Sequence, residues 1–260
     1  MSRGSLAARI DAALDAAGLA HTRLTARDLA PLDQFHTGGL RATMELAAAL
    51  DPAAGARVID VGCGLGGAAR YVASTFQCQV RGIDLSPSFI DAARLLTERS
   101  GLADHVQFDV GNAVALPYPD RTFDIAWTQH AAMNVRDRAG MYAEVFRVLR
   151  PGGRFGMSDI LAGTGALHFP VPWAEEQHTS FLMDGAALRE ALEGAGFRVV
   201  SWTDRSDTSL ASLDALASSP RSPLSLELVM GDRFPEMVAT LARNLRERRA
   251  TVAEIVVAKP

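Results

Sequence analysis

From residue 56 onward, short strand-like runs of hydrophobic residues alternate with stretches in which apolar residues recur at helical spacing. Short runs rich in Val, Ile and Phe are typical of strands, and they span 56–60, 79–84, 105–110, 123–127 and 153–160. Stretches with apolar residues at helical spacing separate these runs, and two further strand-like runs follow at 197–202 and 251–259. Strands that alternate with helices predict a mostly parallel sheet with helices on both faces. The pattern therefore predicts an α/β fold.

The first fifty residues carry a different pattern, with two predicted helices ahead of the first strand. Apolar residues recur at helical spacing over 5–17, where Ser5 is a suitable N-cap. A second helix is expected to have Thr37 as its N-cap and to end near residue 50. We therefore expect an N-terminal helical cap over residues 1–50, followed by one α/β domain over 51–260.

Two segments interrupt the alternation of strands and helices. Residues 160–183 are rich in Gly, Pro and aromatic residues, and residues 205–250 contain Ser-rich turns and a predicted helix from Pro235. Both segments leave or rejoin the carboxyl edge of the sheet, where ligands bind in open α/β folds. We expect them to form a lid over a substrate. The alternative is that they are long surface loops without a function.

Composition and charge narrow the classes of partner. The chain has 48% hydrophobic residues and 26 basic against 30 acidic residues, so it can bury a full core but carries no excess of positive charge. Nucleic acid and acidic membranes are therefore disfavoured partners. The N-terminus has no signal-like apolar run, and the two cysteines, Cys63 and Cys78, are expected to be free thiols, so the predicted location is the cytoplasm. The apolar leading helix could serve in a homodimer contact.

The first strand runs directly into a glycine-rich segment, residues 58–67. Gly62, Gly64 and Gly67 match the dinucleotide pattern G-x-G-x-x-G, so their spacing alone leaves a nicotinamide enzyme open. Asp60 lies two residues before the first glycine, where a carboxylate would repel a pyrophosphate but could hold the ammonium of S-adenosylmethionine. Its alternative role is to accept a hydrogen bond as a cap of the following helix.

Polar residues also end the second and third strands. Asp84 lies about twenty residues after the glycines, where an acid can accept hydrogen bonds from a ribose diol, and Leu85 beside it could pack on adenine. Asn112 can accept a hydrogen bond from the adenine amino group, while backbone amides around Ala113 serve the ring nitrogens. Nicotinamide enzymes share the acidic residue, and an isolated Asn is often only a turn former.

Taken in order, these motifs resemble the class I S-adenosylmethionine-dependent methyltransferases, in the small-molecule branch that includes ubiquinone/menaquinone, sarcosine/dimethylglycine and sugar O-methyltransferases. The resemblance covers roughly residues 35–203 and lies in VIDVGCGLGG (58–67), GIDLS (82–86), GNAVALPYPDRTFDIAW (111–127) and EVFRVLRPGGRF (144–155). It implies a Rossmann-like seven-stranded sheet with a reversed last strand. It also implies cofactor contacts at Asp60, Gly62, Gly64, Asp84 and Asn112, and we expect further contacts at Cys63, Leu85, Ala113 and Gln129. Relatives often carry Asp in place of Asn112, but an amide oxygen can also accept a hydrogen bond.

The loop after the fourth strand is predicted to lie beside the reactive sulfonium, as the resemblance implies. It contains Gln129 and His130, the leading candidates for the catalytic pocket, and Met133, which is expected to contact the acceptor. Methyl transfer is an in-line displacement that needs alignment and exclusion of water, and a hydroxyl or amine acceptor also benefits from a general base. His130 is the first candidate base and His36, in the entrance segment 33–39, is the second; a purely structural role is the alternative for each.

The first insertion supplies further candidates for the acceptor site, namely His168, Trp173 and His178. Packing within a lid is the alternative for the aromatic residue. The histidines lack the paired short spacings of zinc ligands, so no metal is expected.

The predicted function is transfer of a methyl group from S-adenosylmethionine to nitrogen or oxygen of a small molecule, with carbon as an open alternative and S-adenosylhomocysteine as product. The alternatives are an NAD-dependent oxidoreductase and a binding or cyclase-like protein that retains the cofactor.

Overall fold

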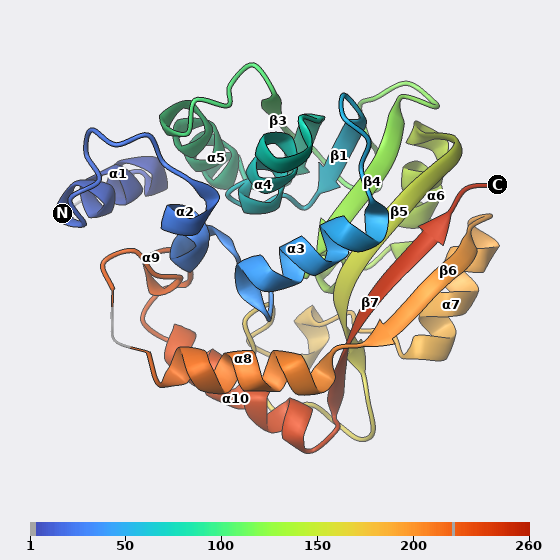
Figure 1. The fold of residues 1–260 in the computed structure, drawn as a ribbon. Coiled ribbons are helices and arrows are strands. Elements are labelled where there is room, and N and C mark those ends of the chain that lie inside the picture. Colours follow the sequence, from blue (N-terminus) through green and yellow to red (C-terminus); the bar gives the residue numbers. More distant parts are fainter. Residues whose placement is uncertain (1–3, 220–221) are drawn as a thin grey trace.

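Seven strands form one sheet in the computed structural model, which describes residues 4–219 and 222–260 (Figure 1). The strands are β1 (Arg57–Val61), β2 (Gln79–Asp84), β3 (Val106–Val110), β4 (Phe123–Gln129), β5 (Leu149–Ala162), β6 (Arg198–Asp204) and β7 (Ala250–Ala258). Their order across the sheet is β3-β2-β1-β4-β5-β7-β6, and β7 runs antiparallel to both of its neighbours. This confirms the predicted sheet with a reversed last strand. Positions 1–3 of the predicted cap and 220–221 of the second insertion lie outside the described residues.

Helices cover both faces of the sheet, as predicted. They are α1 (Leu6–Ala16), α2 (Ala26–Asp33), α3 (Gly39–Leu50), α4 (Gly67–Phe76), α5 (Pro87–Arg99), α6 (Arg138–Val148), α7 (Gly185–Gly194), α8 (Ser206–Ala217), α9 (Glu227–Met230) and α10 (Phe234–Arg246), with short 3-10 helices at Ala132–Asn134 and Gln177–Thr179. Successive side chains of a strand point to opposite faces. Val58 of β1 therefore packs with α3 and α4, whereas Ile59 packs with α6 and α7.

The N-terminal region contains one helix more than the sequence predicted. Helix α1 begins as expected at Ser5, whose hydroxyl accepts a hydrogen bond from the backbone of Ala8. Helix α2 was not predicted, although Thr25 and Asp28 form a reciprocal capping box at its start. The prediction that Thr37 caps the next helix is wrong, because α3 begins after a left-handed Gly38.

The helices of the predicted cap pack in two different places. Helices α1 and α2 pack on α5 and α4, and a buried ion pair of 2.7 Å between Asp33 and Arg70 joins α2 to α4. Helix α3 instead packs directly on the sheet, where Leu50 contacts the backbone of β5 at Gly156. The segment between α2 and α3 is consequently held over the carboxyl edge of β1.

The second insertion is largely helical. The predicted helix from Pro235 is present as α10. Of the predicted Ser-rich turns, residues 206–217 instead form α8, whereas the described serines that follow, Ser218, Ser219, Ser222 and Ser225, do lie outside helices. The apolar side of α8, which includes Leu210 and Leu213, packs with α10, and the two helices lie together at the bottom of Figure 1. A helix can be rich in serine when tertiary packing stabilises its apolar face.

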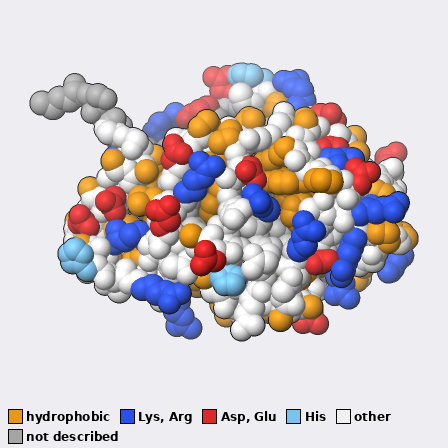
Figure 2. All heavy atoms as spheres, turned by 90° about the horizontal axis from the view of Figure 1, so that it is seen from above, with side chains coloured by type: hydrophobic (Ala, Val, Ile, Leu, Met, Phe, Trp, Pro, Cys, Tyr) orange, Lys and Arg blue, Asp and Glu red, His pale blue; other side chains and the backbone are white. Residues whose placement is uncertain are grey.

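Acidic and basic side chains are interspersed on the face of the molecule shown in Figure 2. This face therefore lacks the extended basic patch that is typical of nucleic-acid-binding surfaces. Within the described part of the chain, none of the helices has both the length and the hydropathy that a bilayer span requires.

Candidate cofactor and acceptor site

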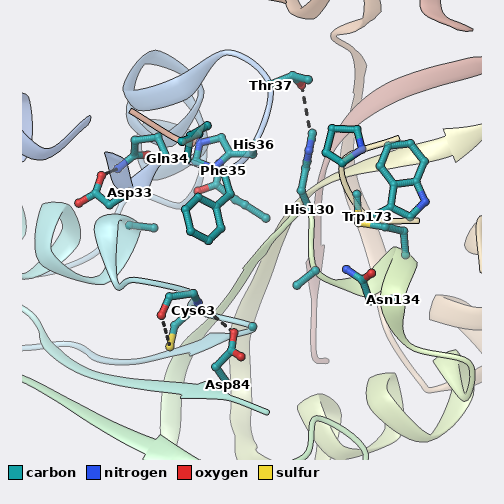
Figure 3. Close-up of a pocket in the computed structure, with 18 of the residues that line it drawn as sticks. Asp33, Gln34, Phe35, His36, Thr37, Cys63, Asp84, His130, Asn134 and Trp173 are labelled. Carbon is teal, nitrogen blue, oxygen red and sulfur yellow. Dashed lines mark hydrogen bonds between the residues drawn. The ribbon is translucent and has the colours of Figure 1, made fainter. Parts of the chain in front are cut away.

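A cavity of about 600 Å³ lies at the carboxyl ends of β1, β2, β3 and β4. Strands β1 and β4 are adjacent there although they are not consecutive in the chain, and such a switch point is where α/β folds bind ligands. Most of the predicted site residues line this cavity: His36, Asp60, Gly62, Cys63, Gly64, Asp84, Leu85, Asn112, Ala113, Gln129, His130, Met133 and Trp173. Figure 3 shows His130 and Trp173 on one side of it and Cys63 and Asp84 on another.

The glycine-rich loop after β1 is held in a conformation that larger residues would not adopt. Gly62 has a φ of 76°, and a Cβ atom there would lie 2.2 Å from the Cβ of Ala131. The backbone amides of Gly62 and Cys63 both donate to the carbonyl oxygen of Ile83, at 2.8 and 3.1 Å. The loop is thereby attached to the end of β2 and exposes its backbone to the cavity.

Asp84 organises the end of the cavity that lies beside the glycine-rich loop. One of its carboxylate oxygens accepts a hydrogen bond from the amide of Gly64 at 3.0 Å, and the other accepts one from the amide of Ser86 at 2.9 Å. Each carboxylate oxygen can accept a second hydrogen bond, so the fixed side chain can still bind a diol. The neighbouring Leu85 is 72% exposed at the cavity, which leaves an apolar surface available for a flat ring.

Asp60 is buried with only part of its hydrogen-bonding capacity used. It is 3% exposed, it accepts a hydrogen bond from the backbone of Ala69 in the first turn of α4, and its Oδ2 has no partner among the described residues. Asp60 therefore makes the helix-capping contact and also forms part of the cavity wall. Burial, and secondarily the negative charge of Asp84, raises the pKa of Asp60 to about 7.

Asn112 also has a local structural contact. Its side-chain oxygen accepts a hydrogen bond from the amide of Val114 at 3.1 Å, which forms the turn that was the alternative to a ligand contact. The residue nevertheless lines the cavity, and a carbonyl oxygen can accept two hydrogen bonds.

Two histidines from distant parts of the chain meet at the cavity, with 6.0 Å between the centroids of their rings. Nε2 of His36 lies 3.0 Å from the carbonyl oxygen of Gly39, and because that oxygen only accepts, Nε2 carries the proton. Nε2 of His130 lies 3.4 Å from the hydroxyl of Thr37. Burial lowers the pKa of His36 to about 4 and holds the pKa of His130 well below its usual value, so both rings are neutral at pH 7.

The backbone and neighbours of His130 fix its position. Its φ of 48° lies in the left-handed region, which costs free energy in a residue with a side chain and is often found at functional sites. Beside it, the Gln129 side-chain oxygen accepts hydrogen bonds from Trp127 Nε1 at 3.0 Å and from Thr43 at 3.1 Å. The indole nitrogen can only donate, which fixes the orientation of this amide.

His168 and His178, both predicted to line the acceptor site, lie outside the cavity. His168 pairs with Glu247 at 2.9 Å, and its backbone amide donates to Asn244 of α10. The side chain of His178 is 75% exposed beside Glu176. His168 is thus held against the end of α10, and neither histidine is part of the cavity wall, so we do not include either in the proposed site. Trp173 alone of the three reaches the cavity, and its Nε1 donates to Ser180 at 2.9 Å.

The structure adds cavity residues that the sequence did not single out. They come from the helices of the second insertion and include Leu213, Leu216, Met230, Phe234 and Leu241. Apolar residues three positions apart within the Ser-rich segment, such as Leu213 and Leu216, were a signal for α8. Across residues 4–219 and 222–260, no three His, Cys, Asp or Glu side chains gather as metal ligands would.

Comparison with known proteins places this chain in a family. The model of the methyltransferase domain matches residues 59–157. The O-methyltransferase resE of Aspergillus sclerotiorum is 33% identical over 207 residues, which is 78% of this chain and 76% of that protein. Several longer relatives, among them plant phosphoethanolamine N-methyltransferases, match over about a third of their own length.

Two solved structures bear on the cofactor and on the alternatives. Geranyl diphosphate methyltransferase, solved in complex with S-adenosylmethionine, shares the fold at 22% identity, with a TM-score of 0.70 and coverage of 84% of each chain. The [4+2]-cyclase SpnF is 27% identical, with a TM-score of 0.67 and coverage of 85% of this chain and 80% of that chain. The relatives by sequence carry methyltransferase names, so neither the cyclase-like nor the oxidoreductase alternative is favoured. The chain belongs to the class I S-adenosylmethionine-dependent methyltransferases, in the branch that acts on small molecules.

Proposed function

We propose that the cavity binds S-adenosylmethionine through residues at three successive strand ends and methylates a small molecule held under the lid. In this proposal Asp84 accepts hydrogen bonds from the ribose, and Leu85, Asn112 and Ala113 surround the adenine. The ammonium of the methionyl group lies near Asp60. The observation that carries the proposal is the unpartnered, buried Oδ2 of Asp60 in the wall of the same cavity as Asp84.

The residues present fit this cofactor in both charge and shape. A buried carboxylate oxygen without a partner is costly, and a cationic ligand nearby would offset that cost. The left-handed Gly62 and Gly64 keep side chains away from the space beside Asp60 and Asp84. Gln129, from the end of β4, lines the same cavity, and we propose that it contacts cofactor and acceptor alike.

We assign the proton transfer to His130. The bound cofactor supplies a methyl group that is already activated by a sulfonium charge. A neutral imidazole can take the proton that a hydroxyl or amine acceptor loses, and His130 is neutral at pH 7. Thr37, 3.4 Å from Nε2 of His130, helps to orient the ring, and His36 is the second candidate base.

Helices α8 and α10 support the proposed lid, since both supply side chains to the cavity wall. The proposed cap then comprises α1 and α2. The apolar face of α1 is covered by α5 and α9, so a homodimer contact at this helix gains no support. Cys63 and Cys78 are both free, which is consistent with the proposed cytoplasmic location. The acidic net charge of −4 supports a small molecule over nucleic acid as the partner.

The proposed function can be tested with S-adenosylmethionine labelled in the transferred methyl group. Incubation of the protein with a pool of small metabolites is expected to move the label into at least one of them, with matching release of S-adenosylhomocysteine. Label that stays entirely on the cofactor, or appears on added DNA or RNA instead, would contradict the proposal.

Binding of S-adenosylhomocysteine is expected to depend on the protonation of Asp60. Burial raises the pKa of Asp60 to about 7, and a nearby ammonium favours the charged carboxylate. Below pH 7 binding must therefore release a proton, so the dissociation constant should rise by up to about tenfold per pH unit between about pH 7 and pH 5 and be flat above that range. Calorimetry near pH 6 in two buffers of different ionisation enthalpy measures the released proton.

The variant Asp60→Asn serves as the control for this pH dependence. It should bind more weakly at pH 8 and lose the proton release. His36, whose pKa is lowered to about 4 by burial, does not account for a change in this range. An affinity of the natural protein that stays constant from pH 8 to pH 5 would show that Asp60 does not face the ammonium.

A further inference from the structure

The part of the cavity formed by the lid is lined almost entirely by hydrocarbon. Its side chains include Trp173, Leu213, Leu216, Met230, Phe234 and Leu241. The polar side chains near them, Thr37, Asn134, Ser212 and His130, can form hydrogen bonds but carry no charge at neutral pH. This lining contrasts with the cofactor end, where Asp60 and Asp84 lie.

The cavity offers no positive charge to an anionic acceptor. Among the described residues that line it there is no Lys and no Arg. The two arginines that are buried in the described part of the chain are already paired: Arg70 with Asp33 at 2.7 Å, and Arg138 with Asp159 at 3.0 Å. Neither Arg70 nor Arg138 is part of the cavity wall. A phosphate or carboxylate on the acceptor would therefore be desolvated without a partner, which is strongly unfavourable.

The lid end also offers no negative charge to a cationic acceptor. The acids in the described wall of the cavity are Asp33, Asp60 and Asp84. Asp33 is neutralised by Arg70, and the other two lie at the strand ends that we assign to the cofactor. A permanently charged ammonium under the lid would thus have no counterion.

Part of the apolar wall of the cavity is accessible. Leu216 of α8 is 45% exposed although it belongs to the cavity wall. Such exposed apolar area is stabilised when an apolar ligand covers it.

We infer that the methyl acceptor is an uncharged, largely apolar molecule whose hydrocarbon packs against α8 and α10 under the lid. This inference rests on the proposed function, because it takes the other end of the cavity to be the cofactor site. It names the class of acceptor, neutral and apolar, and excludes phosphorylated, carboxylated and cationic ones.

A matched pair of aromatic probes, which differ only in charge, tests the inference in place of the natural acceptor. The probes are 2-naphthol, which is uncharged at neutral pH, and 2-naphthyl phosphate, which has the same ring system with a dianionic group. Fluorescence titrations are carried out on protein saturated with S-adenosylhomocysteine, so that the cofactor end is occupied. We expect 2-naphthol to bind at least about tenfold more tightly than its phosphate. Equal affinities, a preference for the phosphate, or no binding of 2-naphthol would overturn the inference.

Two arginine substitutions on α8 separate a cavity effect from a general charge effect. Leu216→Arg places a cation in the wall at a site that has room for it, and it should weaken 2-naphthol binding and strengthen phosphate binding, each by about tenfold. Ala215→Arg adds the same charge one residue away, at an exposed position outside the wall, and should leave both affinities unchanged. If the two variants behave alike, the lid does not select the acceptor.

Binding of S-adenosylhomocysteine distinguishes failure of the inference from failure of the proposed function. Both substitutions lie on α8 and not at the strand ends, so calorimetry should show natural affinity for S-adenosylhomocysteine in each variant. Normal binding of S-adenosylhomocysteine with no preference for 2-naphthol would overturn only the acceptor class. Absence of S-adenosylhomocysteine binding in the unsubstituted protein would overturn the proposed function itself.

Discussion

Substitution of Asp84 by alanine is expected to weaken binding of S-adenosylhomocysteine by at least about 100-fold. The variant loses the charge-assisted hydrogen bonds that we propose to the ribose diol, each contributing about 1.5 to 3 kcal/mol. It also loses the two hydrogen bonds that hold Gly64 and Ser86 in place at the rim of the cavity. Isothermal titration calorimetry measures the change in affinity directly.

Asp109→Ala is a suitable control for Asp84→Ala. Asp109 lies near the end of β3 and pairs with Tyr118 at 2.7 Å, but it is not part of the cavity wall. Its removal should leave cofactor affinity within about threefold of the natural value. Thermal unfolding of both variants checks that the fold is retained. Equal losses of affinity in the two variants, or none in Asp84→Ala, would show that Asp84 does not hold the ribose.

Substitution of His130 by alanine is expected to slow catalysis but to leave cofactor affinity nearly unchanged, the reverse of what we expect for Asp84→Ala. Affinity for S-adenosylhomocysteine should change by less than about threefold, whereas turnover should fall by about 100- to 1,000-fold, the usual contribution of a general base. The reason is that His130 accepts the acceptor's proton and is not assigned a contact with the cofactor. Single-turnover assays with an acceptor found by methyl labelling measure the chemical step.

His168→Ala is the matched control for this prediction. It removes a histidine that pairs with Glu247 outside the cavity, so turnover should stay near the natural rate. If His130→Ala turned over as fast as His168→Ala, proton transfer would not pass through His130. A variant that lost cofactor affinity as well would assign His130 to binding.

Features that depend on local sequence could be predicted. The strands, the glycine loop and the polar residues Asp60, Asp84 and Asn112 follow from short-range patterns, because the end of each parallel strand reaches the same edge of the sheet. The proximity of His36 and His130 depends on contacts between residues that are distant in the sequence. Both had been singled out, but only the folded chain brings their rings to within 6.0 Å.

Features that depend on tertiary packing could not be predicted. Helix α8 was missed because its Ser-rich sequence has weak helical propensity, and its packing on α10 supplies the missing stability. His168 and His178 were misplaced because the residue composition of an insertion does not show which of its sides faces the cavity. The left-handed φ of His130 depends on the loop around it, and no residue type in that loop predicts this conformation.

The most direct test of the central claim is a calorimetric titration of the unsubstituted protein at neutral pH with S-adenosylhomocysteine and, separately, with NADH. The residues at the ends of β1, β2 and β3 predict saturable binding of S-adenosylhomocysteine, one molecule per chain, and no saturable heat with NADH. Saturable binding of NADH by a protein that does not bind S-adenosylhomocysteine would contradict the account.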